Sequence, residues 1–250
     1  MLQRILISAI GAGLAVGLLT AAIQHVTTTP LVIAAEAYEQ PGGGHDHGAA
    51  DHAHSSDAAA HGAHTLPASG AETTRREAWA PEDGLERTFY TALTTSLTGV
   101  GFALMLLAAM VFKGGRIDER AGLFWGIGGF AAVALAPALG LPPELPASAT
   151  ADLAGRQIWW LGTIISSACG IGLLAFTVQW WARTAGVLLL AAPHIIGAPH
   201  PQTFTSAVPA ELAGQFAATS LAVSAVFWVL LGWAAASLYQ RLEPTPVAAE

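Results

Sequence analysis

The sequence predicts an all-α integral membrane protein, a bundle of five to six transmembrane helices with a disordered, histidine-rich extracytoplasmic loop. Three observations predict this class. The chain has 250 residues, of which 53 % are hydrophobic and only 11 % are charged, whereas about 25 % of the residues of a soluble domain are charged. Six apolar runs can be drawn along the chain. Six of the nine histidines lie in one short segment between the first two runs.

The first apolar run extends from about Ile5 to His25 and follows Arg4. A helix needs about 20 residues, at ~1.5 Å each, to cross a hydrocarbon core of ~30 Å, and this run is long enough. The alternative is a signal peptide cleaved at the Ala-Glu-Ala sequence of residues 35–37, but the apolar core of such a peptide is usually about 7–15 residues long. We therefore interpret residues 1–25 as an uncleaved first transmembrane helix.

The other runs form a polytopic helical bundle over residues 89–239. They are 89–112, 121–141, 157–181, 185–198 and 211–239. Trp159-Trp160 and Trp180-Trp181 bracket run 157–181, and a helix between these pairs would extend about 31 Å with tryptophan at both headgroup boundaries. Run 185–198 is short and carries Pro193, so we expect it to be kinked, tilted or re-entrant.

Pairs of glycines four residues apart predict where helices approach each other closely. The pairs are Gly13/Gly17 and Gly122/Gly126. In lipid, close backbone approach is a main source of helix association, so we interpret both pairs as packing positions.

The basic residues predict the orientation, because cytoplasmic loops carry an excess of lysine and arginine. With the N-terminus inside, six basic residues face the cytoplasm and four face out. The inward set is Arg4, Lys113, Arg116, Arg120, Arg183 and Arg241, and the outward set is Arg75, Arg76, Arg87 and Arg156. This orientation makes residues 26–88 an extracytoplasmic loop and residues 240–250 a cytoplasmic tail.

The histidine-rich segment, residues 42–64, reads GGGHDHGAADHAHSSDAAAHGAH. Imidazole suits divalent cobalt, nickel, copper and zinc, and a nearby carboxylate can complete the shell. Because the spacers are glycine, alanine and serine, we expect a flexible loop that captures metal without a rigid site. The alternative is a solvated low-complexity linker. The capture residues are His45, Asp46, His47, Asp51, His52, His54, His61 and His64.

A second group of polar residues falls near the outer ends of the predicted helices. Ionisable groups at membrane depth are costly and usually face a cavity or each other, and proline-interrupted short segments point to transport sites. We therefore predict a shallow, outward-facing metal site. Its candidate ligands are His25, Glu36, Glu144, His194, His200 and Glu211. The alternatives are interfacial histidines and, for Glu144 and Glu211, carboxylates that cap helices.

Several stretches resemble the CbtA family, the predicted cobalt transporter subunit. They are HVTTTPLVIAAEAYE (25–39), WGIGGFAAVALAPALGLPPELP (125–146), DLAGRQIWW (152–160), PHIIGAPHP (193–201) and VPAELAGQF (208–216). The resemblance implies a multi-pass protein of the bacterial inner membrane that moves Co²⁺ inward for cobalamin synthesis. It also implies a small single-span CbtB-like partner with a histidine-rich tail. The family is usually described with five spans, one fewer than the six apolar runs.

Other function classes lack their motifs. The sequence has no GxxxxGK[ST], so no ATP site is expected, and it has no HExxH, GxSxG or CxxC, so we predict that the chain is not an enzyme. The basic stripe of a nucleic-acid-binding protein is also missing. The alternatives that stay open are a nickel or zinc transporter and a membrane metal-binding or sensor protein that transports nothing.

Overall fold

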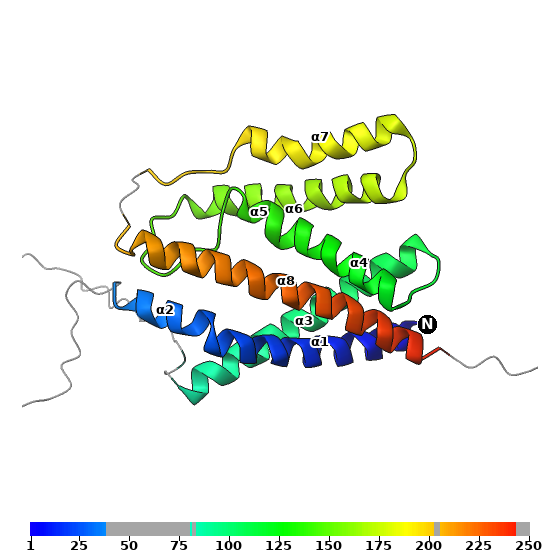
Figure 1. Cartoon of the computed structure of the whole chain (residues 1–250), viewed down its shortest axis with the longest axis horizontal. Helices are drawn as coiled ribbons and strands as arrows, with labels where there is room; N and C mark the ends of the chain where they lie inside the picture. The colour runs from blue at the N-terminus through cyan, green and yellow to red at the C-terminus, as the bar shows by residue number, and fades with distance from the viewer. Residues whose placement is uncertain (39–80, 82–83, 203–205, 244–250) are drawn as a thin grey trace, which may run out of the picture.

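The computed structural model describes residues 1–38, 81, 84–202 and 206–243. In these ranges the regular structure is helical, which confirms the predicted all-α class (Figure 1). The elements are α1 (Leu2–Val26), α2 (Thr28–Glu36), α3 (Leu85–Lys113), α4 (Glu119–Phe130), the π-helical turn η1 (Ala131–Leu135), α5 (Ala136–Ala138), α6 (Leu153–Phe176), α7 (Trp180–Ile196) and α8 (Ala210–Arg241). The predicted capture residues of segment 42–64 lie outside the described ranges.

Five segments are long and apolar enough to cross a membrane. Four of them are α1, α3, α6 and α8. The fifth is the continuous segment Glu119–Ala138, which consists of α4, η1 and α5. Each coincides with one of the five long apolar runs. α1 supplies Ala9, Ala12 and Val16 to the main core, so the first run is an integral part of the bundle.

The predicted loop 26–88 begins with a helix, because the chain resumes helical structure at α2 after a one-residue break. Thr27 leaves the helical path with φ −118° and ψ −68°. Its hydroxyl donates to the carbonyl of Ile23 at 2.6 Å. Pro30 has no N–H for the carbonyl of Val26, which explains why α1 and α2 are not one continuous helix.

The predicted helix over residues 157–181 is wrong at its end. α6 ends at Phe176, and Thr177 takes an extended conformation while its hydroxyl donates to the carbonyl of Leu173 at 2.7 Å. The second tryptophan pair therefore opens α7 and does not close α6. Hydropathy hides this turn, because Val178 is as apolar as the helices on either side.

α7 consequently starts earlier than predicted and runs back beside α6 as an antiparallel hairpin (Figure 1). Its 17 residues extend about 26 Å, and Pro193 lies in its last turn. The Nε1 of Trp159 donates to the carbonyl of Pro193 at 3.2 Å. The hydroxyl of Ser166 donates to the carbonyl of Leu189 at 2.5 Å. α6 ends at the end of the bundle opposite to the start of α8, so α7 runs back along the bundle, although it is not among the five segments long and apolar enough to span.

α8 lies at the centre of the bundle. Within the described residues it contacts α1, α2, α3, α4 and η1, whereas α3 makes no contact with α6, and α7 packs on α6 alone. Leu231, Trp228 and Phe227 of α8 are buried in the main core together with residues of α1 and α3. α8 thus joins two halves, α1–α3 on one side and α4–α7 on the other (Figure 1).

Glycines set the closest contacts between helices, as the two predicted pairs indicate. Gly13 and Gly17 of α1 lie against the backbone of α3, and Gly122 and Gly126 of α4 lie against the backbone of α8. A Cβ added at Gly232 would meet the carbonyl oxygen of Gly122. These contacts leave no room for a side chain, so the helix spacing depends on glycine.

Adding a methyl group at the α4–α8 contact should loosen the bundle. We expect Gly232→Ala to destabilise the protein by about 1–3 kcal/mol, because overpacking displaces the two backbones. Thermal unfolding in detergent measures this. Gly214→Ala is the matched control in the same helix, since a Cβ there meets nothing within 4 Å. Equal melting temperatures for the two variants would contradict the close contact.

The passage of α7 predicts opposite accessibility for its two ends. In a Cys169→Ala background, cysteines at exposed Gln179 and Ala207 should react with an impermeant maleimide from opposite sides of the membrane. A cysteine at Thr150, in the connection between α5 and α6, is the control and should react from the same side as Ala207. Labelling of Gln179 and Ala207 from one side would show that α7 is re-entrant.

Candidate functional site

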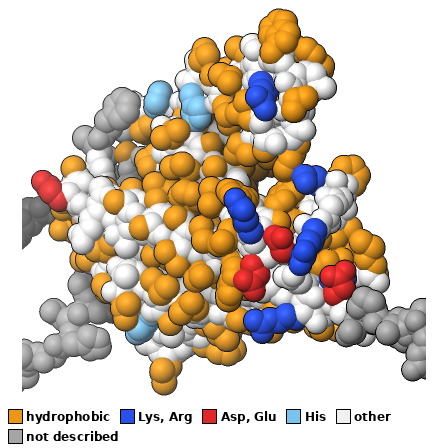
Figure 2. Space-filling model, turned by 45° about the vertical axis from the view of Figure 1, so that its right-hand side comes forward, with side chains coloured by type: hydrophobic (Ala, Val, Ile, Leu, Met, Phe, Trp, Pro, Cys, Tyr) orange, Lys and Arg blue, Asp and Glu red, His pale blue; other side chains and the backbone are white. Residues whose placement is uncertain are grey.

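The two ends of the bundle differ in charge. We call the end at which α1 ends and α3 and α8 begin the loop end, because residues 38 and 84, which flank the undescribed segment, lie there. The six basic residues predicted to face the cytoplasm all lie at or beside the opposite, charged end, where Figure 2 shows arginine, lysine and acidic groups gathered. There Arg4 lies 3.5 Å from Glu243, and the hydroxyl of Ser237 donates to Glu119 at 2.9 Å.

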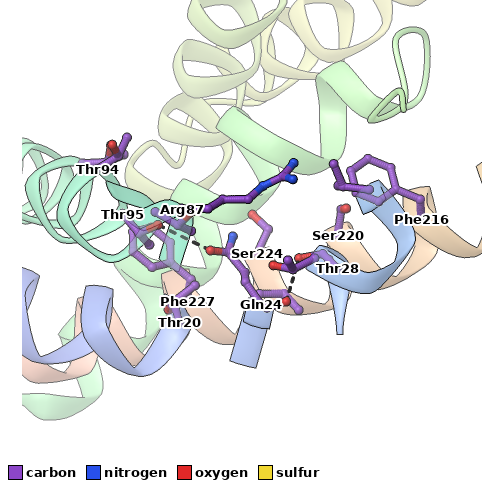
Figure 3. Close-up of a pocket in the computed structure, with 15 residues that line it drawn as sticks. Thr20, Gln24, Thr28, Arg87, Thr94, Thr95, Phe216, Ser220, Ser224 and Phe227 are labelled. Carbon is purple, nitrogen blue, oxygen red and sulfur yellow. Dashed lines mark hydrogen bonds between the residues drawn. The ribbon is translucent and has the colours of Figure 1, made fainter. Parts of the chain in front are cut away.

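The first cavity, of about 460 Å³, lies toward the loop end between α1, α2, α3 and α8. Nine of its fifteen lining residues carry a hydroxyl group. They are Thr20, Thr28, Thr29, Thr91, Thr94, Thr95, Thr98, Ser220 and Ser224. Figure 3 shows Gln24 between Thr28 and Thr95, with Arg87 of α3 extending into the space that the α8 serines face. The hydroxyls of Thr95 and Thr28 donate to the side-chain and backbone oxygens of Gln24, each at 3.4 Å.

The second cavity, of about 400 Å³, adjoins the first across the same face of α8. It is lined by η1, α5, α6 and α8, and Ser220 and Ser224 line both cavities. Glu144, Arg156 and Gln157 supply its other polar groups. Its wall includes the π-helical turn, an irregularity that frequently marks functional sites. The loop end therefore contains two adjacent cavities that share one wall and carry polar groups among apolar ones.

Each cavity has an arginine on its lining that is paired with a glutamate. Arg87 binds Glu36 through both guanidinium nitrogens of its fork, one at 3.1 Å. Arg156 donates to Glu144 at 2.6 Å, while its buried Nε has no acceptor among the described residues. Charge-assisted pairs of this kind are strong, and each one neutralises the charge that its arginine presents to the cavity.

The six ligands predicted for a shallow metal site occupy separate positions. Glu36 and Glu144 are bound to arginines, and Glu211 is exposed in the first turn of α8. His194 lies on α7 with its ring centroid 6.1 Å from that of Trp159, and His200 is exposed beyond the end of α7.

His25 lines a small side cavity of about 100 Å³ that shares Thr29, Arg87 and Thr91 with the first cavity. Among the described residues, no three histidine, cysteine or acidic side chains are close enough to hold a metal ion together. The six residues thus form no joint site here, and a ligand role for any of them stays a prediction.

The hydroxyl lining was missed by the sequence analysis, although the sequence contains its signal. Thr91, Thr94, Thr95 and Thr98 follow the spacing i, i+3, i+4, i+7, which places them on one face of a helix. A polar stripe on a helix of membrane length predicts a face that lipid does not cover. The predicted site consists of ionisable residues and does not include these neutral hydroxyls.

This architecture defines a class: a polytopic helical membrane protein with polar cavities near one end, as in membrane transport proteins. The family described as Probable cobalt transporter subunit (CbtA) matches residues 2–240, and the chain belongs to this family. The word subunit in that description implies at least one partner. Comparisons with curated proteins and with solved structures found no match.

Loss of one partner of a cavity ion pair should destabilise the fold. We expect Glu144→Gln to lower the free energy of unfolding by about 1–3 kcal/mol, because Arg156 keeps a half-buried charge without its carboxylate. The charge swap Glu144→Arg with Arg156→Glu should recover part of the loss. Glu243→Gln is the control, since that carboxylate is 65 % exposed and exposed pairs contribute little. Equal effects of Glu144→Gln and Glu243→Gln on thermal unfolding would contradict this.

Proposed function

We propose that this chain carries Co²⁺ inward across the bacterial inner membrane for cobalamin synthesis, as the multi-pass subunit of a transporter. The observation that carries the proposal is the position of the two polar cavities. They lie at the end of the bundle to which the histidine-rich segment 42–64 is attached by residues 38 and 84. Metal collected by that segment would be released next to the entrance of a polar space.

The distribution of basic residues supports the direction of transport. Arg4, Lys113, Arg116, Arg120, Arg183 and Arg241 share one end of the bundle, and this end faces the cytoplasm under the positive-inside rule. The loop end and the histidine-rich segment then face out. Entry of the ion through the cavities is entry from outside.

The histidine-rich segment acts as a collector in this proposal. Its imidazoles and carboxylates bind cobalt weakly and raise its local concentration, and nickel and zinc compete because imidazole binds them too. Protons compete for the same nitrogens, so capture fades as the pH falls through about 6.5, the ordinary pKa of histidine.

The membrane potential suffices to drive uptake. It is worth about 2.3 kcal/mol per charge per 100 mV, roughly 4.6 kcal/mol for a divalent ion. At a factor of ten per 1.4 kcal/mol this corresponds to about three decades of accumulation. The proposal therefore requires no ATP site. Its other component is the partner, a CbtB-like single-span subunit with a histidine-rich tail.

Uptake of radiolabelled cobalt by cells that contain the full chain and its partner tests the function. We expect a variant with the six histidines of 42–64 replaced by asparagine to lose several-fold in uptake at submicromolar cobalt and little at saturating cobalt, because only capture is impaired. Deletion of 42–64 is the companion variant, and excess nickel or zinc measures selectivity.

Undiminished uptake by the asparagine variant would remove the capture role and leave transport intact. Cobalt binding without uptake, in cells and in proteoliposomes, would overturn transport and favour a binding or sensor protein.

A further inference from the structure

We propose that the two cavities act as one chamber that receives a divalent cation with its hydration shell in place, held through its waters by hydroxyl and amide oxygens. This inference rests on the proposed function and specifies the form in which the ion enters. No histidine, cysteine or acidic residue is among the described residues that line the first cavity. In the second cavity, the carboxylate of Glu144 accepts a hydrogen bond from Arg156.

The size of the chamber fits a hydrated ion. Water occupies about 30 Å³ per molecule, so a shell of six waters needs about 180 Å³. The first cavity alone offers about 460 Å³ and the second about 400 Å³.

The charge of the lining favours the same form. Both cavity arginines are neutralised by glutamates, so the described residues of the chamber present no free carboxylate to replace lost water. Stripping an ion of water without replacement is very costly, of the order of 20 kcal/mol for a single charge moved to a low dielectric. An ion that keeps its shell avoids this cost and binds only weakly, as a transported ion must.

The threonine hydroxyls suit reversible contact with water. The hydroxyl of Thr20 donates to the carbonyl of Val16 at 2.8 Å, and that of Thr28 donates across the break to the carbonyl of Gln24 in the last turn of α1. Such bonds to the preceding turn satisfy the donor when the wall is dry. The oxygen still has lone pairs that accept from the water of an ion.

Ser220 and Ser224 belong to the wall that the two cavities share. They lie one helical turn apart on α8 and line both spaces, and their side chains are small. On the far side, Pro137 has no N–H for the carbonyl of Val133, and both residues line the second cavity. A hydrated ion would thus pass from hydroxyls to a wall with additional carbonyl oxygen.

Hexaamminecobalt(III) tests the inference, because its ligands do not exchange and it can bind only through hydrogen bonds from its shell. We expect it to inhibit cobalt uptake competitively in cells that contain the partner and the variant without residues 42–64. The double variant Thr94→Val/Thr98→Val should weaken inhibition by about tenfold, since two hydrogen bonds of about 0.7 kcal/mol each are lost. Valine keeps the shape of threonine. Thr184→Val, exposed on α7 away from both cavities, is the control.

A second measurement does not depend on transport. In a Cys169→Ala background, a cysteine at Thr98 should react with a hydrophilic maleimide, and hexaamminecobalt(III) should slow that reaction several-fold in purified protein. The Ser220→Ala/Ser224→Ala variant, checked for an unchanged melting temperature, should lose most of this protection.

The outcomes separate the inference from the function. Cobalt uptake without inhibition by hexaamminecobalt(III), or with inhibition unchanged in the valine variant, overturns the hydrated-ion chamber and leaves transport standing. Protection at Thr98 in a protein that moves no cobalt supports the chamber and overturns transport. No maleimide reaction at Thr98 means that a helix of the partner or lipid fills the space, which overturns the chamber.

Discussion

The structure depends on the close contact between α8 and α4. Where the glycines at 122, 126 and 232 meet, two backbones touch with no side chain between them. In lipid the hydrophobic effect does not press helices together, and dispersion contacts at short range replace it. α8 can therefore hold two halves that scarcely touch each other.

This arrangement also explains where the cavities lie. α3 packs along α1 and makes no contact with α5, α6 or η1 among the described residues. The two halves diverge from α8 toward the loop end and leave a wedge there, and the sequence fills its walls with hydroxyls. A neutral hydroxyl can donate to the preceding turn of its own helix, as Thr20 does to Val16, so this wedge costs less than one built from charges. The charges that are present come as arginine–glutamate pairs across each flank.

In the proposed transport, capture and passage would rely on different chemistry. Imidazole nitrogens bind late transition metals directly and discriminate among divalent ions. Oxygens that hold the water of an ion discriminate poorly and release quickly. Under this proposal, selectivity lies in the histidine-rich segment and the partner, and the bundle is free to bind weakly. A tight site inside the bundle would hold the ion instead of releasing it.

The sequence by itself determined the helical class, five of the long helices, the glycine contacts and the grouping of basic residues at one end, because hydropathy, residue size and charge are local properties. The turn at Thr177–Gln179 was not predicted from the sequence, since a three-residue break within an apolar run leaves no hydropathy signal. The tertiary structure alone decided that Glu36 and Glu144 pair with arginines. It also brought the hydroxyls of α1, α3 and α8 to one space, because such proximity arises only when helices distant in sequence pack together.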